Sequence, residues 1–308
     1  MGSKARFWWG GLLAVALWWP VEAAEARVNV VATLPDLAAI AREVGGEHVQ
    51  VSAMAYPTQD PHFVDARPHL ILYLNRADLL VLNGLELEVG WLPTLLTGAR
   101  NGRIQPGTNG YFDASTVVPL KQVPQLRIDR SMGDLHPGGN PHFTVDPRNG
   151  ALIALALAER LVASDPAHRA GYRARAQAFA ATARDFAAAE AKRFAKIPAN
   201  RRQVVAYHQS LIYLLDWLGL EGINNLEPKP GIPPSPGHVA TVLSQMRQIG
   251  VEAILQESYW PTTASELLAK RAEAKVVVLP GGTNFDGGQT YLDYIREVVR
   301  RVAEGLKR

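Results

Sequence analysis

The 308-residue chain has 47% hydrophobic and 20% charged residues, a composition typical of a globular protein. Its formal net charge is only +3 and its basic residues are scattered, which excludes the dense basic surface of a nucleic-acid-binding protein. Because the sequence contains no cysteine, we expect no disulfide, no thiolate ligand and no lipid attached through a cysteine, so a metal site has to use His, Asp, Glu or water.

Residues 1–26 have the three parts of a secretory signal peptide. Lys4 and Arg6 precede an uncharged apolar run over residues 7–19, and Ala24 and Ala26 fit a small-x-small cleavage site. The run is shorter than the roughly 20 residues that a membrane-spanning helix needs. We therefore predict a cleaved signal peptide and a soluble mature protein in the periplasm. An uncleaved N-terminal anchor is the alternative.

Residues 27–163 alternate between strand and helix patterns, as in a parallel sheet covered by helices on both faces. A stretch rich in Pro, Gly and polar residues, 117–141, is expected to be a loop. The expected strands cover residues 28–34, 49–55, 78–83 and 111–114, and the expected helices cover residues 37–44, 68–75, 87–96 and 147–162.

A long helical segment follows, over residues 164–198. Asp165 and Pro166 form a helix start signal, and no other Pro occurs before Pro198. About 30 helical residues would span about 45 Å, enough to run the height of a two-lobed protein. Its apolar positions are mostly Ala rather than Leu or Ile, which argues against a coiled-coil dimer, and we expect a monomer.

The strand and helix alternation resumes over residues 199–308. The expected strands cover residues 203–207, 222–226, 252–256 and 275–279, and the expected helices cover residues 211–218, 239–249, 264–271 and 291–304. The predicted fold class is therefore α/β, with two Rossmann-like lobes of parallel sheets joined by one long α-helix. The predicted domains are a signal peptide (1–26), an N-terminal lobe (27–163), the connecting helix (164–198) and a C-terminal lobe (199–308).

Potential metal ligands follow several of the expected strands, where parallel α/β sheets bind their ligands. His62 lies just beyond the second strand, His142 precedes a helix, and His208 comes directly after the strand VVAY. Two acids compete for a fourth position: Glu257 ends its strand, and Asp286 lies in the Gly-rich loop GGTNFDGG. A cleft between the lobes could gather these residues around one ion.

The other histidines are expected to be ordinary surface or hydrogen-bonded residues: His48, His69, His168 and His238. His136 stands six residues before His142 in a Gly-rich stretch, and its role stays open. Three aspartates each precede a Pro, which a turn or a helix cap explains without any function: Asp60, Asp146 and Asp165.

Three histidine-bearing segments resemble those of the ZnuA/TroA-like family, the cluster A-I solute-binding proteins of zinc and manganese ABC importers. They are DPHFVDARP, GNPHFTVDP and VVAYHQSLIYLLDWLGLE, and the segment EPKPGIPPSPGHVATVL resembles the family's second lobe. The resemblance implies a periplasmic receptor, not an enzyme, that carries a metal to an ABC permease and its ATPase. It implies the metal ligands His62, His142, His208 and Asp286.

The third of these positions points to zinc. Manganese-type members of the family carry a carboxylate there, and this chain has His208, whose imidazole suits Zn²⁺ better than Mn²⁺. The chain lacks the long His- and acid-rich loop of many zinc members. It thus resembles the AztC-like branch, some members of which pair with a periplasmic zinc chaperone.

Three alternatives stay open. A manganese or iron receptor of the same family would bind through the same residues. A secreted zinc hydrolase could use three histidines with Glu257 as base, although neither an HExxH nor a GxSxG motif is present. A receptor for an organic solute or metal chelate would be expected to gather Arg side chains at its cleft.

Overall fold

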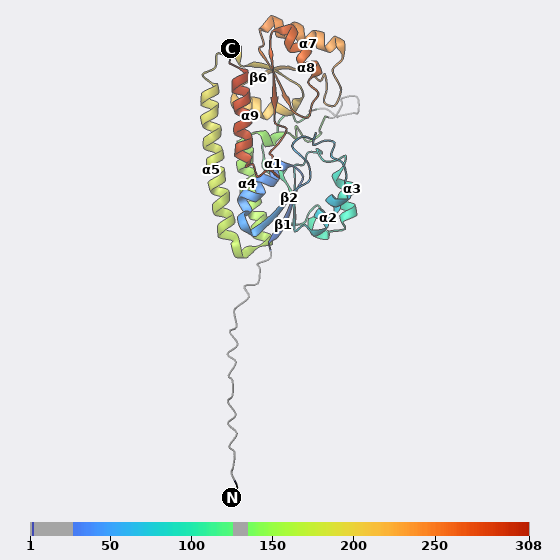
Figure 1. Cartoon of the computed structure of the whole chain (residues 1–308), viewed down its shortest axis with the longest axis vertical. Coiled ribbons are helices and arrows are strands. Elements are labelled where there is room, and N and C mark those ends of the chain that lie inside the picture. Colours follow the sequence, from blue (N-terminus) through green and yellow to red (C-terminus); the bar gives the residue numbers. More distant parts are fainter. Residues whose placement is uncertain (1, 3–26, 126–134, 308) are drawn as a thin grey trace.

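The computed structural model describes residue 2, residues 27–125 and residues 135–307. Apart from Gly2, the predicted signal peptide lies outside the described residues. Figure 1 shows two lobes, one at each end of the long helix α5, which runs beside both. The predicted fold class, two parallel-sheet lobes with one long helix, is confirmed.

Each lobe contains a four-stranded parallel sheet, with strand order β2-β1-β3-β4 in the first and β6-β5-β7-β8 in the second. The first sheet consists of β1 (Val28–Ala32), β2 (Val49–Ala53), β3 (Leu79–Leu82) and β4 (Tyr111–Asp113). The second consists of β5 (Gln203–Ala206), β6 (Glu221–Asn225), β7 (Ala253–Glu257) and β8 (Lys275–Leu279). All the predicted strands are present.

The helices follow the predicted order. In the first lobe they are α1 (Pro35–Gly45), α2 (Pro68–Arg76), α3 (Leu92–Ala99) and α4 (Pro147–Ser164). After α5 (Arg169–Phe194) come α6 (Ile212–Leu218), α7 (Pro236–Ile249), α8 (Thr263–Ala272) and α9 (Tyr291–Gly305). Within the described residues, no helix is both long and apolar enough to span a bilayer.

Local sequence signals explain several helix starts. Proline occupies the first turn of α1, α2, α4 and α7, where its missing N–H costs nothing. Asp146 caps α4 by accepting a hydrogen bond from the Arg148 backbone N–H at 2.8 Å. The role predicted for Asp146, a helix cap, is therefore confirmed.

The helix expected over residues 87–96 begins later, at Leu92. Gly84, Leu85 and Glu86 all have a positive φ, so the chain turns sharply after β3. The buried Glu88 carboxylate accepts hydrogen bonds from the backbone N–H groups of Asn83, at 2.7 Å, and Gly84, at 3.1 Å. These bonds stabilise a turn where the apolar pattern alone suggested a helix.

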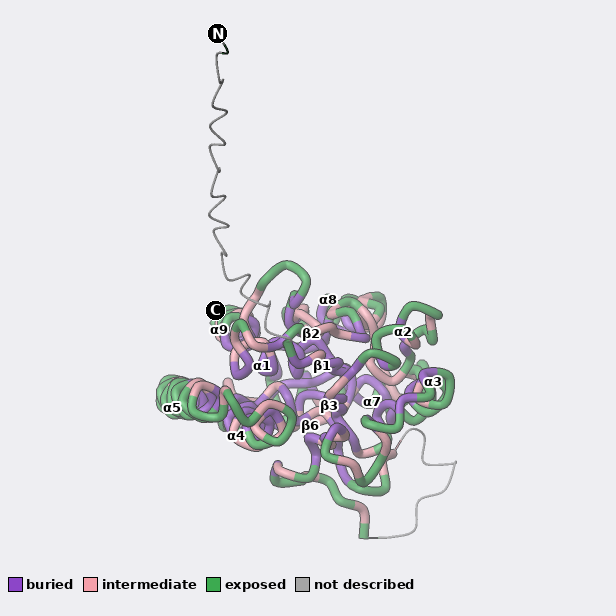
Figure 2. The backbone as a smooth tube through the Cα atoms, turned by 90° about the horizontal axis from the view of Figure 1, so that it is seen from below, coloured by how far each residue is buried: buried purple, intermediate pink, exposed green. Residues whose placement is uncertain are grey.

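The long helix begins at Arg169, after a 3₁₀ turn over Pro166–His168. Its buried residues form a stripe of small and aromatic side chains that packs on α4, and its outer face is exposed (Figure 2). Alanine at many of these positions lets the two helices approach closely. The predicted lobe boundaries at 163/164 and 198/199 stay predictions.

One hydrophobic core connects the lobes. It contains the first sheet, α4 and the buried face of α5, and it continues into α6 and α9 of the second lobe. A smaller cluster packs the remainder of the second sheet against α7 and α8. Since well-packed cores resist continuous deformation, large hinge opening between the lobes is disfavoured.

Candidate metal centre

His62 lies in the loop between β2 and α2, and Asp60 orients its ring. The Asp60 carboxylate oxygen Oδ1 is 2.7 Å from His62 Nδ1 and also accepts the His62 backbone N–H at 3.0 Å. Burial raises the pKa of Asp60, but these hydrogen bonds and the charge of His62 outweigh it and lower the pKa overall. When Nδ1–H is donated to Asp60 and the ring is neutral, the Nε2 lone pair of His62 is available to a ligand.

His142 lies immediately before the 3₁₀ turn Phe143–Val145 that leads into α4. Its backbone N–H donates to Asn140 Oδ1 at 3.0 Å, and the Asn140 carbonyl accepts from the Tyr213 hydroxyl, also at 3.0 Å. Within the described residues, the His142 Nε2 atom is buried without a hydrogen-bond partner. A buried nitrogen without a partner destabilises the fold, so this atom is a candidate to bind a ligand.

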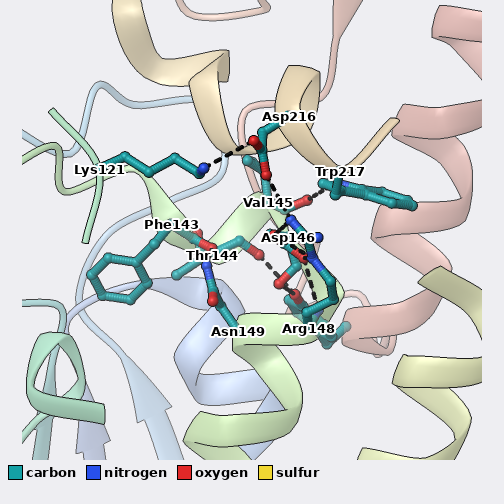
Figure 3. Close-up of polar contacts among 10 residues, drawn as sticks. Lys121, Phe143, Thr144, Val145, Asp146, Arg148, Asn149, Asp216 and Trp217 are labelled. Carbon is teal, nitrogen blue, oxygen red and sulfur yellow. Dashed lines mark hydrogen bonds and ion pairs between the residues drawn. The ribbon is translucent and has the colours of Figure 1, made fainter. Parts of the chain in front are cut away.

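Contacts between the lobes hold the segment after His142 in place (Figure 3). Asp216 of α6 accepts from Arg148 at 3.0 Å and pairs with Lys121 at 3.0 Å. The Trp217 indole N–H donates to the Val145 carbonyl at 3.3 Å. The turn that carries His142 is therefore attached to the lobe that carries the third histidine.

His208 follows β5 at the carboxyl end of the second sheet. Its Nδ1 atom is 2.6 Å from Glu227 Oε2, and both residues are buried. Glu227 follows β6, so two adjacent strands of the sheet deliver the histidine and its carboxylate. As with Asp60 and His62, the carboxylate occupies Nδ1 and leaves Nε2 to a ligand.

The structure brings His62, His142 and His208 together. Their ligating atoms all lie within 4.8 Å of one another. Burial, together with the charges of the neighbouring histidines, lowers the pKa of His142 well below its usual range. A neutral imidazole is the form that binds a metal, so this environment prepares the ring for a divalent cation.

Neither of the two acids considered from the sequence belongs to the histidine group, although Glu257 lines a cavity together with His142. Asp286 is exposed and does not belong to the histidine group. Its neighbour Phe285 is anchored to α1, because the Phe285 carbonyl accepts from Arg42 at 3.0 Å. Glu257 is buried, and its Oε2 atom has no hydrogen-bond partner among the described residues; burial raises its pKa. The assignment of Asp286 as the fourth ligand stays a prediction.

Sequence reasoning missed the residues that orient and surround the three rings. Asp60 was expected to serve only a turn, and Glu227 was not singled out. His136, whose role was left open, has its Nε2 atom 3.3 Å from His62 Nε2. The available signal was proximity in sequence, because Asp60 and His136 each lie within six residues of a candidate histidine. His48, His69, His168 and His238 lie outside the group.

Comparison with known proteins places this site in a family. The family profile described as "ZnuA: Zinc-uptake complex component A periplasmic" matches residues 30–305. The manganese ABC transporter substrate-binding lipoprotein PsaA of Streptococcus pneumoniae is 24% identical over 305 residues, which cover 97% of this chain and 95% of PsaA. The iron-binding protein YfeA of Yersinia pestis is 25% identical over 292 residues, 91% of this chain and 86% of YfeA.

A crystal structure of ZnuA superposes with a TM-score of 0.74 at 21% sequence identity, and the match covers 91% of this chain and 100% of that one. At this identity the superposition supports the shared fold alone.

Proposed function

The chain belongs to the family of ZnuA, the periplasmic component A of zinc-uptake complexes, and we propose that it captures Zn²⁺ and delivers it to a membrane permease. The family consists of solute-binding components of ABC metal importers, not of enzymes. Export through the signal peptide at residues 1–26 would place the protein in the periplasm. Its proposed partners are an ABC permease with its ATPase, and a periplasmic zinc chaperone as in the AztC-like branch.

The observation that carries the zinc proposal is the chemistry of the three-histidine group. Three neutral imidazole nitrogens form a borderline ligand set that suits Zn²⁺, whereas Mn²⁺ prefers more oxygen ligands. Two of the rings are oriented by carboxylates, Asp60 and Glu227, in the arrangement typical of histidines that bind zinc. We propose His62, His142 and His208 as ligands.

Asp286 is the fourth ligand that the sequence predicts. Because its side chain is exposed and outside the group, binding through this carboxylate requires the loop after β8 to move. A carboxylate would balance part of the charge of the ion.

The second candidate function is manganese or iron uptake. It is favoured by the names of the relatives, since PsaA is described as a manganese component and YfeA as an iron-binding protein. Both readings share the fold, the periplasmic location and the permease, and they differ in the cargo alone.

Metal analysis of the mature protein, purified without an affinity tag, tests the proposal. We expect one zinc ion per chain, and we expect Zn²⁺ to displace Mn²⁺ in a competition titration at neutral pH. Preferential retention of Mn²⁺ or Fe²⁺ would support the second candidate function instead. A protein that binds none of these ions stoichiometrically would exclude both.

A further inference from the structure

His136 stands closer to the metal centre than its position in the sequence suggests. Its Nε2 atom is 3.3 Å from His62 Nε2, and the two ring centroids are 5.4 Å apart. We propose that His136 is a ligand of the bound ion, so that the site is formed by four imidazoles, with no need of the Asp286 carboxylate. This inference rests on the proposed function, since it concerns the same site.

The distance between the two nitrogens is that expected of ligands of one ion. Two imidazole nitrogens, each about 2.0–2.1 Å from a tetrahedral zinc ion, lie about 3.3–3.4 Å from each other. His62 already donates its Nδ1–H to Asp60, so the Nε2 atom that faces His136 carries a lone pair. Without an ion, the two nitrogens can share a proton in an N–H···N hydrogen bond. When both carry a lone pair, a divalent cation can take the place of that proton.

The segment that carries His136 is positioned by specific contacts. The His136 ring lies beside the backbone of Leu85, in the sharp turn after β3. The His136 carbonyl accepts the Gly139 backbone N–H at 3.2 Å, and Asn140 N–H donates to the Lys121 carbonyl at 2.8 Å. Gly139 has φ of +118°, a conformation that glycine adopts readily and other residues rarely do.

The turn after β3 and this segment also fit each other sterically. A Cβ atom at Gly138 would lie 2.7 Å from Leu85 Cδ2, so the glycine allows the segment to approach the turn. Glu88 stabilises the same turn through the Asn83 and Gly84 N–H groups. A chain of contacts therefore runs from the end of β3 to the His136 ring.

The cavity beside these rings has room for a single ion or water molecule. It has a volume of about 20 Å³, slightly more than one water-sized particle requires, and His136, His142 and His208 all line it. The His142 Nε2 atom has no other partner among the described residues. His136 is not part of the group whose ligating atoms lie within 4.8 Å of one another, so its ring has to shift toward His142 and His208 when the ion binds.

A fourth imidazole ligand would increase the selectivity of the site for Zn²⁺ over Mn²⁺. Four neutral nitrogens supply no anionic oxygen, which disfavours Mn²⁺ relative to Zn²⁺. The Asp60 and Glu227 carboxylates, each bound to the outer nitrogen of a ligand ring, then supply the negative charge near the ion.

X-ray absorption spectroscopy of the zinc-loaded mature protein tests the proposal without any substitution. We expect four imidazoles and no carboxylate around zinc. Three imidazoles with one oxygen ligand would overturn the role of His136 and leave the zinc receptor intact. Failure of the unaltered protein to bind zinc stoichiometrically would instead overturn the proposed function.

Substitutions supply the second measurement. In a chelator competition assay, His136→Ala should weaken zinc binding at least tenfold and reduce the imidazole count by one. His69→Ala, at an exposed position on α2, is the matched control for loss of a histidine. If His136→Ala binds zinc as tightly as the His69→Ala control, the proposal is wrong.

Discussion

Asp36 of the first lobe accepts two hydrogen bonds from Thr283 of the second, from its backbone N–H and its hydroxyl, both at 2.8 Å. The other Asp36 oxygen accepts from the Thr144 hydroxyl at 2.9 Å, and all three residues are buried. Burial raises the pKa of Asp36, and the hydrogen bonds partly offset this effect. The carboxylate thus joins α1, the loop after β8 and the turn that follows His142.

Replacing Thr283 by Val should destabilise the protein, because it removes the hydroxyl that donates to Asp36 and keeps the side-chain volume. A hydrogen bond to a charged group contributes about 1.5–3 kcal/mol, so we expect a loss of unfolding free energy in that range. Chemical denaturation measures it. The control is Thr241→Val on the exposed face of α7. Its unfolding free energy should lie within about 0.5 kcal/mol of that of the unaltered protein. Equal stability of the two variants would contradict this role of Thr283.

Replacing His142 by Ala should weaken zinc binding at least tenfold and leave the apo-protein folded. The ring contributes an Nε2 atom without a partner among the described residues, and the backbone N–H, which the substitution keeps, makes the bond to Asn140. Isothermal titration calorimetry measures the affinity, and circular dichroism checks the fold. His69→Ala serves again as the control. Unchanged zinc affinity in His142→Ala would remove His142 from the site.

Replacing Glu227 by Gln should reduce zinc affinity about 10- to 100-fold, the usual effect of altering the outer partner of a metal-binding histidine. The amide no longer supplies the negative charge that raises the basicity of the His208 ring. Glu221→Gln is the control, because Glu221 is exposed and bonds to Gln203 at 2.9 Å. Chelator competition gives both affinities, and similar values would show that the contact with His208 does not tune the metal site.

Glu88 should make stability depend on pH. Burial raises its pKa from 4.5 to about 7, although hydrogen bonds from Thr33 and the backbone act in the opposite direction. The folded protein therefore binds the proton more tightly than the unfolded chain, and the unfolding free energy falls as pH rises between these two values. The contribution is about 1.4 kcal/mol per pH unit, or about 3 kcal/mol in total.

Glu88→Gln should remove that contribution, because the amide does not titrate. From pH 5 to pH 7, the unaltered protein should lose unfolding free energy relative to Glu88→Gln. Above pH 8, the difference between the two proteins should be constant. Urea denaturation at a series of pH values measures the difference. Parallel stability curves for the two proteins would mean that Glu88 has an ordinary pKa.

Much of the fold could be predicted because its signals are local. Apolar runs of strand length mark all the strands, and Pro at the first turn marks the starts of α1, α2, α4 and α7. The true start of α3 was not recovered, although Pro93 lies in its first turn, because the apolar pattern extended the predicted helix back to residue 87. It depends on Glu88, whose carboxylate binds the backbone of Asn83 and Gly84 and stabilises a turn against the helical pattern.

For the metal centre, the sequence by itself determined which residue types were available and which histidines follow the strand ends. Only the tertiary structure decided which of them meet. His62 and His142 reach His208 because the two lobes pack against each other, and His136 reaches His62 because its segment packs on the turn after β3. The physical reason is that periodicity reports on neighbours within a few residues, whereas a metal site depends on distances between side chains that only the packing of distant segments sets.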